Sequence, residues 1–513
     1  MFDAHPGKPL CAAAPPDSSL PTMPPAGSLP RLQRQKGLVG AMETEPSLND
    51  EAVADALFDA LDEALGPRGV LRGDDIGERY RCDVLGNTGE MPRAVIRPRN
   101  TAEVSAALRL CHAQGACVVT QGGRTGLALG QLPRTGEIIL SLERMIDIES
   151  VDADSGTATV QAGAVLQSVQ ERVAPLGLMF PLDLGGRGSC TIGGNIATNA
   201  GGNRVIRYGM TRELVIDLEA VLADGTVLGD LKTIVKNNTG PDLKQLFIGS
   251  EGIYGVVTRA VLRLVPKPAG AVVALCGVRS FAQVRALLRH LRARLGGELT
   301  AFEVLWRSYL KHAAALKERP PFAQEHAFHV LVEGSGPDAA RLQAGFEGAL
   351  QEALAEAIVD DVVVAQSEAD SLRLWHVRDL AIEVCRRIDP IVPFDVSVAI
   401  GDMEAFTEGL DAAARQIDPR CEVIVFGHVG DGNLHLAVHQ PPDRPETFEA
   451  IERAVYALVG RYRGSVSAEH GIGWLKRDFL GHSRSPAEIE TMRQLKAVLD
   501  PRGILNRHRI FTL

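Results

Sequence analysis

Hydrophobic and polar positions along the first half of the chain alternate between a helical and a strand period. A helical spacing places Val53, Leu57, Leu61 and Leu65 on one face, after SLND, which resembles a capping box beginning at Ser47. Further along, RAVIRP is typical of a strand, TAEVSAALRLCHAQG of a helix, and ACVVT of a strand followed at once by a glycine loop. The alternation continues to GVVTRAVLRLVPKP, and KPAG then predicts a domain boundary near residue 268.

The second half of the chain also mixes helices and strands. It begins with the predicted helix SFAQVRALLRHLRARLGG, and the tail is predicted as the helix SPAEIETMRQLKAVL, stopped by Asp500-Pro501. We therefore predict an α+β fold with a first domain at 47–268, a second at 269–460 and a C-terminal segment at 461–513 that completes the active site.

The stretch 1–46 has a different composition. Nine of the 29 prolines fall within the first fifty positions, in a region without hydrophobic period, so we predict a disordered leader. It lacks the apolar core of a secretory signal. RLQRQKG is compatible with a transit peptide, although the prolines oppose an amphipathic helix, and translation from Met42 is a third interpretation.

Composition and charge narrow the class of protein. The chain has 513 residues, 45% hydrophobic and 23% charged, which is ordinary for a globular enzyme of two or three domains. A net charge of -10 argues against a nucleic-acid partner. No apolar run reaches the length of a membrane span, and the eight cysteines form no Cys-x-x-Cys pair. These features predict a cytoplasmic protein with reduced thiols.

The segment FGHVGDGNLHLAVH combines three histidines with an Asp-Gly turn signal between two alternating stretches. If Asp431 and Gly432 are the central residues of a two-residue turn, His428 lies directly across from His435. Opposed residues have β-carbons about 4.5–5.5 Å apart, close enough for two imidazoles to share a metal ion. A solvated hairpin with incidental histidines is the alternative, and the metal site needs a third ligand.

The segment GSVSAEHGIG offers that ligand in the adjacent residues Glu469 and His470. Neighbours on an extended segment point to opposite sides, so the two residues are not expected to be equivalent ligands. A pair on the protein surface is the alternative interpretation.

Three glycine clusters mark the first domain: TQGGRTGLALG, PLDLGGRGSCTIGGNIATNAGG and NNTGPDLKQLFIGSEGIYG. Without a β-carbon, successive N–H groups can form a concave nest around phosphate oxygens. Neither a Gly-x-Gly-x-x-Gly opening a helix after a strand nor a P-loop sequence is present, so a large anionic ligand would need another arrangement of loops.

Eight blocks of the sequence, taken in order, resemble the signatures of the FAD-linked D-2-hydroxy-acid dehydrogenases. This family includes D-2-hydroxyglutarate dehydrogenase, D-lactate dehydrogenase and the glycolate oxidase flavin subunit, within the vanillyl-alcohol oxidase/PCMH superfamily. The blocks span about 48–513 and are GGRTGLALG, PLDLGGRGSCTIGGNIATNAGG, RYG, LADGTVL, NNTGPDLKQLFIGSEG, GHVGDGNLH, SAEHGIG and LDPRGILN.

The resemblance implies a PCMH-type domain that holds FAD, followed by an α+β substrate or cap domain. Arg124 stands where relatives with covalent flavin have histidine, so the FAD is expected to be non-covalent. The residues implied in cofactor binding are Gly122, Gly123, Arg124, Thr125, Gly126, Pro181, Asp183, Gly188, Ser189, Gly193, Gly194, Asn195, Thr198, Asn199, Gly202, Glu251, Gly252, Val256 and Asn506.

The resemblance also assigns the chemistry of the second domain. It implies a divalent metal, which we expect to be zinc, on His428, His435 and Glu469, with His470 as base, Arg378 as the clamp for the substrate carboxylate and Asn433 in the catalytic site. The metal would polarise the hydroxyl of a D-2-hydroxy acid, His470 would accept a proton, and a hydride would pass to the flavin.

Two positions depart from the D-2-hydroxyglutarate dehydrogenase pattern. Ile382 stands where a threonine is expected and Pro393 where a lysine is expected, which favours an apolar or monocarboxylic substrate.

The reduced flavin would pass electrons to a quinone or an electron-transfer protein, and we expect a homodimer. A metal-dependent hydrolase and a non-catalytic flavin electron carrier are the alternative functions.

Overall fold

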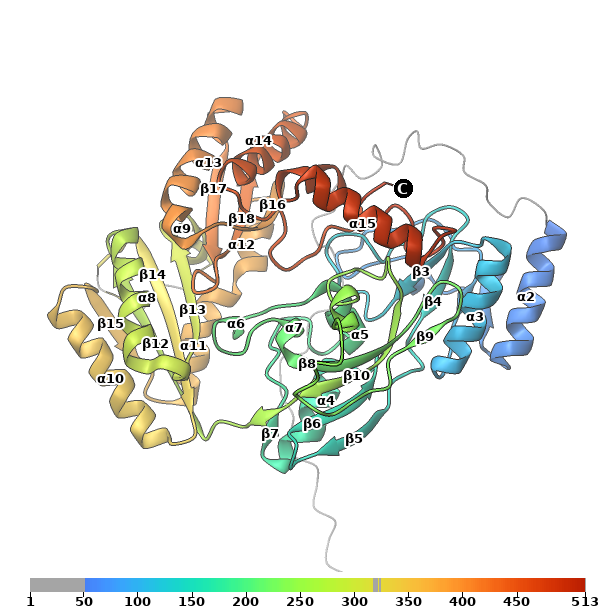
Figure 1. The fold of residues 1–513 in the computed structure, drawn as a ribbon. Coiled ribbons are helices and arrows are strands. Elements are labelled where there is room, and N and C mark those ends of the chain that lie inside the picture. The colour runs from blue at the N-terminus through green and yellow to red at the C-terminus, as the bar shows by residue number, and fades with distance from the viewer. Residues whose placement is uncertain (1–50, 317–321, 323, 513) are drawn as a thin grey trace, which may run out of the picture.

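The structure, a computed structural model, describes residues 51–316, 322 and 324–512. Figure 1 shows two bodies, formed by the first and second halves of the chain, with the C-terminal segment returning to the first. Helices and strands are mixed in both, as predicted. The predicted leader at 1–46 and the capping box at Ser47 lie outside the described residues. No helix in the described ranges is both long and apolar enough to cross a bilayer.

A small sheet and two helices form one side of the first body. Helix α3 begins after Asn100, whose side chain accepts the Glu103 N–H, and ends at Gly115, which has a left-handed φ of 68°. Leu57, Leu61 and Leu65 of α2 are buried, as their spacing predicted. The sheet order is β1 (Val70–Leu71), β2 (Val95–Ile96), β4 (Ile138–Ser141), β3 (Val118–Gln121), and the helices are α2 (Glu51–Leu65) and α3 (Thr101–Gln114).

A second, antiparallel sheet shares one hydrophobic core with the first. Its order is β5 (Ile148–Asp152), β6 (Thr157–Gln161), β10 (Val256–Arg263), β8 (Val215–Val221), β9 (Val227–Leu228). The first glycine cluster follows β3 of the small sheet, whereas the other two lie between strands of this second sheet. The connection from β6 to β8 contains the second cluster and carries the short elements α4 (Leu166–Val173), β7 (Leu178–Met179), which pairs with β11 (Val265–Pro266), α5 (Ile192–Thr198), α6 (Val205–Tyr208) and α7 (Thr211–Leu214).

The second body is built on a seven-stranded antiparallel sheet. Its strands in spatial order are β15 (Asp361–Val364), β12 (Gly270–Val278), β14 (Phe328–Gly336), β13 (Leu299–Trp306), β17 (Glu422–Gly427), β18 (Asn433–His439) and β16 (Ile391–Ser397). A large core lies between one face and the helices α8 (Phe281–Leu295), α10 (Ala339–Ala355), α13 (Met403–Ile417) and α14 (Thr447–Arg461). Smaller cores join the other face to α9 (Arg307–Ala315), α11 (Glu368–Asp379) and α12 (Ala381–Arg387).

The C-terminal segment connects the two bodies. Helix α15 (Pro486–Leu499) begins with a complete capping box between Ser485 and Glu488, and it lies beside the first body in Figure 1. The chain then runs beside β3, where Val118 donates its N–H to Ile504 and accepts the N–H of Asn506. The last residues of the chain therefore become part of the first body.

Candidate active site

Polar side chains lie together on the face of the large sheet that packs on α9, α11 and α12. The strand register places them there. Leu305 of β13 pairs with Phe426 of β17, Phe426 with His435 of β18, and His435 with Asp395 of β16. Side chains directly opposite one another share a face, so His435 and Asp395 are neighbours in one row across the sheet. His428 and Asn433 lie two positions further along on the same face.

The predicted pairing of His428 with His435 is wrong by two residues, because Phe426 is the partner of His435. The strands are joined by a five-residue loop, residues 428–432, not by a two-residue turn. The His428 carbonyl accepts the N–H groups of Asp431, Gly432 and Asn433 at 3.1–3.2 Å, which closes the longer loop. A shift of two residues keeps His428 on the same face, so its ring still lies 5.1 Å from that of His435.

His428 is enclosed by two residues from other elements. Its Nδ1 lies 2.6 Å from Oε1 of Glu303 on β13, and its Nε2 lies 3.2 Å from Nη2 of Arg378 on α11. Burial raises the pKa of Glu303, but the opposing effect of His428 and Arg378 is larger and lowers the pKa to about 2. Burial lowers the pKa of His428, whereas Glu303 raises it, with a net value of about 9. Glu303 thus stabilises positive charge at this imidazole, whether a proton or a bound metal ion carries it.

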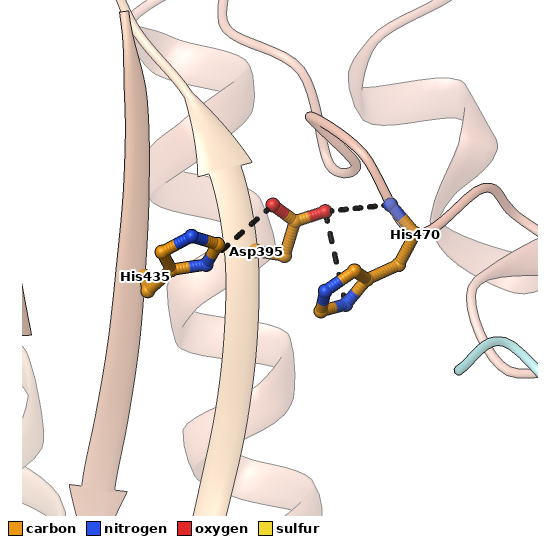
Figure 2. Close-up of side chains that lie close together, drawn as sticks. All are labelled: Asp395, His435 and His470. Carbon is orange, nitrogen blue, oxygen red and sulfur yellow. Dashed lines mark hydrogen bonds and ion pairs between the residues drawn. The ribbon is translucent and has the colours of Figure 1, made fainter. Parts of the chain in front are cut away.

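The segment with Glu469 and His470 is fixed to the sheet by Asp395. Oδ2 of Asp395 accepts the backbone N–H groups of Ala468, Glu469 and His470 at 3.1, 2.9 and 3.0 Å. Figure 2 shows this carboxylate between the rings of His435 and His470. Asp395 itself is fully buried, and the ammonium group of Lys476 lies 3.7 Å from Oδ2.

Within the part of the chain that the structure describes, two groups of side chains could hold a metal ion, and they share His435. In each group the candidate ligand atoms lie within 4.8 Å of one another: His428, His435 and Glu469 form one, and Asp395, His435 and His470 form the other. The first contains the three predicted ligands. Burial is the main cause that raises the pKa of Glu469 to about 7, and no described side chain donates a hydrogen bond to its carboxylate. A divalent cation would compensate this buried carboxylate, so the residues fit a metal.

Asn433 has an unusual environment for a buried amide. It is 4% exposed, and neither its side-chain nitrogen nor its oxygen has a hydrogen-bond partner among the described residues. Because buried polar groups are normally paired, this amide is available to a ligand on the His435 face.

The glycine loops of the first body pack closely on one another. A β-carbon on Gly123 would lie 2.0 Å from the Ser189 carbonyl oxygen, and one on Gly122 would lie 2.3 Å from Oγ1 of Thr191, so both positions require glycine. The backbone N–H groups of residues 122–126 donate to no other described residue. Free, clustered N–H groups next to a strand end fit a phosphate-bearing cofactor.

The other predicted cofactor residues lie in the second glycine block, around Glu251 to Val256, and at Asn506 in the C-terminal segment. Asn506 accepts the Thr120 N–H at 3.0 Å and donates to the Glu251 carbonyl at 2.6 Å. The Val256 side chain is buried at the start of β10, which leaves only its backbone for a cofactor. The second glycine block, between β7 and α6, contains Pro181, Asp183, Gly188, Ser189, Gly193, Gly194, Asn195, Thr198, Asn199 and Gly202, while Gly252 packs on the Asn506 amide.

The cofactor loops and the candidate metal ligands meet at two places. A β-carbon on Gly201 would lie 2.9 Å from Oε1 of Glu469. The Glu251 carboxylate accepts the N–H groups of Ile472 and Gly473 at 2.6 and 2.8 Å, three and four residues after Glu469. Glu303 and Asp395 were not predicted as site residues. The sequence signal for each is a single acid within an apolar stretch, LTAFEVLW and VPFDVS respectively.

Comparisons with known proteins identify the class. Residues 92–229 match the FAD binding domain model, and residues 267–510 match the model of the C-terminal domain of FAD linked oxidases. Solved structures with the same fold include p-cresol methylhydroxylase, with a TM-score of 0.73 and 15% identity over 90% of this chain and 98% of that one. Another is 4-ethylphenol oxidase from Gulosibacter chungangensis, with a TM-score of 0.69, 17% identity and the same coverage. The protein is thus an α+β flavoprotein of PCMH type.

Similarity to individual relatives identifies the family. The chain is 41% identical over 453 residues to the mitochondrial D-2-hydroxyglutarate dehydrogenase of Bos taurus, covering 87% of this chain and 82% of that protein. It is 40% identical over 442 residues to the D-2-hydroxyglutarate dehydrogenase of Xanthomonas citri pv. viticola, covering 85% and 92%. The chain belongs to the FAD-linked D-2-hydroxy-acid dehydrogenases, which confirms the predicted family and enzyme class.

Proposed function

We propose that this enzyme oxidises a D-2-hydroxy acid to the 2-oxo acid with both FAD and a divalent metal, zinc being the ion that the ligand set suits best. The observation that supports the metal is the convergence of His428, His435 and Glu469, whose candidate ligand atoms lie within 4.8 Å. Two imidazoles and one carboxylate leave coordination positions open for a substrate.

Arg378 and His470 have separate roles in this proposal. The Arg378 guanidinium, held by Glu303 at 3.1 Å and 3.2 Å from His428 Nε2, is placed to bind the substrate carboxylate beside the metal ligands. Burial lowers the pKa of His470, which keeps its imidazole neutral and able to accept the hydroxyl proton. The unpartnered amide of Asn433 offers a donor and an acceptor to the same substrate.

The two bound groups supply the remaining chemistry. When bound, the metal polarises the hydroxyl and the flavin accepts the hydride. The FAD would be held non-covalently by the residues of the glycine loops named above, since Arg124 offers no covalent attachment.

The substrate side chain is proposed to be apolar or to end without a second carboxylate. Ile382 is 54% exposed on α12, four residues after Arg378, and Pro393 is exposed on β16, two residues before Asp395. Neither supplies a hydroxyl or a positive charge for a distal carboxylate.

The electron acceptor and the oligomeric state are proposed from the same family membership: electrons would leave the flavin to a quinone or an electron-transfer protein, and the enzyme would be a homodimer. A cytoplasmic location is proposed from the cysteines, which form no Cys-x-x-Cys pair. The functional units would be the leader 1–46, the FAD domain 47–268, the substrate domain 269–460 and the completing segment 461–513. Membership in an enzyme family with FAD domains disfavours the hydrolase and passive-carrier alternatives.

An anaerobic titration of the purified protein tests the proposal. We expect a yellow protein with about one divalent metal ion per chain by elemental analysis, whose flavin absorbance bleaches on addition of a D- but not an L-2-hydroxy acid. Glu469→Gln should retain the yellow colour and lose the metal and the bleaching. A metal-free protein that bleaches normally would refute metal dependence, and a yellow protein that no hydroxy acid bleaches would refute the reaction.

A further inference from the structure

Each of the two candidate histidine ligands has a buried carboxylate at its Nδ1 atom. Oε1 of Glu303 lies 2.6 Å from Nδ1 of His428, and Oδ1 of Asp395 lies 3.9 Å from Nδ1 of His435. Both acids are almost completely buried, at 1% and 0% exposure, and they come from strands on opposite sides of the hairpin, β13 and β16. Each ring thus has a carboxylate on its Nδ1 side, hydrogen-bonded in the case of His428 and more distant in the case of His435.

The surroundings of His428 define its tautomer. The second oxygen of Glu303 accepts from Nε of Arg378 at 3.1 Å, which leaves Oε1 to accept from Nδ1 of His428. A guanidinium can only donate, and Nη2 of Arg378 lies 3.2 Å from Nε2. A neutral His428 therefore has its proton on Nδ1 and its lone pair on Nε2, where a bound metal ion would take the place of the Arg378 donor.

Asp395 provides the corresponding oxygen for His435. Its Oδ2 accepts three consecutive backbone N–H groups, whereas Oδ1 is buried and has no hydrogen-bond partner among the described residues. The 3.9 Å separation from His435 Nδ1 is too long for a hydrogen bond. A shift of roughly 1 Å would form one and satisfy an oxygen that is otherwise costly to bury.

We propose that Glu303 and Asp395 are positioning residues that hold His428 and His435 in the tautomer protonated on Nδ1, so that both Nε2 lone pairs are available to one divalent metal. This inference rests on the proposed metal site and adds the groups that orient its ligands. Carboxylates bonded to the far nitrogen of a ligating histidine fix the ring and raise its basicity, and their loss weakens metal binding about 10–100-fold.

Amide substitutions separate this role from simple packing. In Asp395→Asn, the amide oxygen must stay with the three N–H donors, so the NH₂ group faces His435 Nδ1 and favours the wrong tautomer. In Glu303→Gln, the oxygen must stay with Arg378 and the NH₂ group faces His428 Nδ1. Both changes preserve side-chain size and the anchor on one oxygen.

Glu219→Gln is the matched control. Glu219 is a buried carboxylate on β8 that accepts hydroxyl hydrogen bonds from Thr101 and Thr258 and lies 3.5 Å from Arg259, remote from the candidate metal ligands in sequence and sheet. It therefore reports the cost of neutralising a buried acid in the same chain.

The readout is the dissociation constant of zinc, measured by chelator competition on the FAD-loaded protein, with the visible spectrum of the cobalt-substituted protein as a second signal. We expect affinity to fall about 10–100-fold in Asp395→Asn and in Glu303→Gln, with altered cobalt bands and unchanged FAD content. Glu219→Gln should match the wild type.

Three results would overturn the inference. Wild-type zinc affinity in both variants would limit the carboxylates to packing, and loss of FAD together with zinc would show that they maintain the fold. If the wild-type protein binds no divalent metal, the proposed metal dependence fails first and the inference fails with it.

Discussion

In the proposed function, the side chains at positions 382 and 393 determine which substrates the enzyme accepts. Pro393 is tolerated because β16 is an edge strand, where the missing N–H interrupts no ladder on its outer side. It shares a sheet face with Asp395, and Ile382 is exposed on the helix that follows Arg378. These two positions could be located from the sequence, because Ile382 follows Arg378 by four residues and Pro393 directly precedes the stretch FDVS.

The double variant Ile382→Thr/Pro393→Lys should gain activity toward a substrate with a second carboxylate. A charge-assisted hydrogen bond contributes about 1.5–3 kcal/mol, so the ratio of kcat/KM for D-2-hydroxyglutarate to that for an unbranched apolar D-2-hydroxy acid of equal chain length should rise at least about tenfold. Steady-state kinetics with an artificial electron acceptor measures the ratio. A wild-type enzyme that already prefers D-2-hydroxyglutarate would contradict the assigned role of both positions.

At the scale of elements, local sequence patterns predicted individual helices and strands better than they predicted how strands pair. The helices α3, α8 and α15 and the strands around the first glycine loop follow directly from their periods and caps. The hairpin register did not, because the Asp-Gly signal suggested a two-residue turn, whereas the His428 carbonyl closes a loop of five residues. The common face of the two histidines was still predicted, since the error was an even number of residues.

Helix α13 ends at Asp418, whose carboxylate should contribute to the acid stability of the protein. Hydrogen bonds from Arg420 lower the pKa of Asp418 to about 2, and Arg444 lies 3.4 Å away. A carboxyl group with a lower pKa in the folded state stabilises the fold above its ordinary pKa, and this stability is lost as the pH falls from about 5 to 2. Asp418→Asn should therefore lose less stability than the wild type across that interval.

Thermal denaturation at several pH values between 2 and 6 measures this difference. Glu408→Gln is a suitable control, since Glu408 is exposed on the same helix and has no ion pair among the described residues. Parallel curves for the wild type and Asp418→Asn would show that Asp418 makes no such contribution.

At the scale of the whole molecule, the sequence could identify the candidate metal ligands but not the carboxylates proposed to orient them. Glu303 precedes His428 by 125 positions in the chain. The two residues meet because β13 and β17 are adjacent strands in the sheet. No period or motif specifies which strands are neighbours at such separation. Asp395 lies in the apolar stretch VPFDVS, but its bonds to residues 468–470 depend on the same long-range arrangement.

One short segment is bonded to both bodies of the molecule. Residues 468–470 donate their N–H groups to Asp395 in the second body, and residues 472–473 donate theirs to Glu251 in the first. In Glu251→Gln one of the two acceptors becomes a donor, so one of these backbone groups loses its partner, at a cost of about 1–3 kcal/mol.

Hydrogen–deuterium exchange of the holoenzyme measures that loss. Peptides covering residues 468–476 should exchange faster in Glu251→Gln than in the wild type, while Glu219→Gln should leave them unchanged. Equal exchange in all three proteins would contradict the importance of the Glu251 bonds.

The doubly bonded segment also fixes the position of the two residues at its centre. Glu469 and His470 lie between the bonds to Asp395 and the bonds to Glu251, so a displacement of one body relative to the other would strain bonds on one side of them. In the proposed reaction, the base would therefore keep a nearly constant position relative to both the glycine loops and the large sheet.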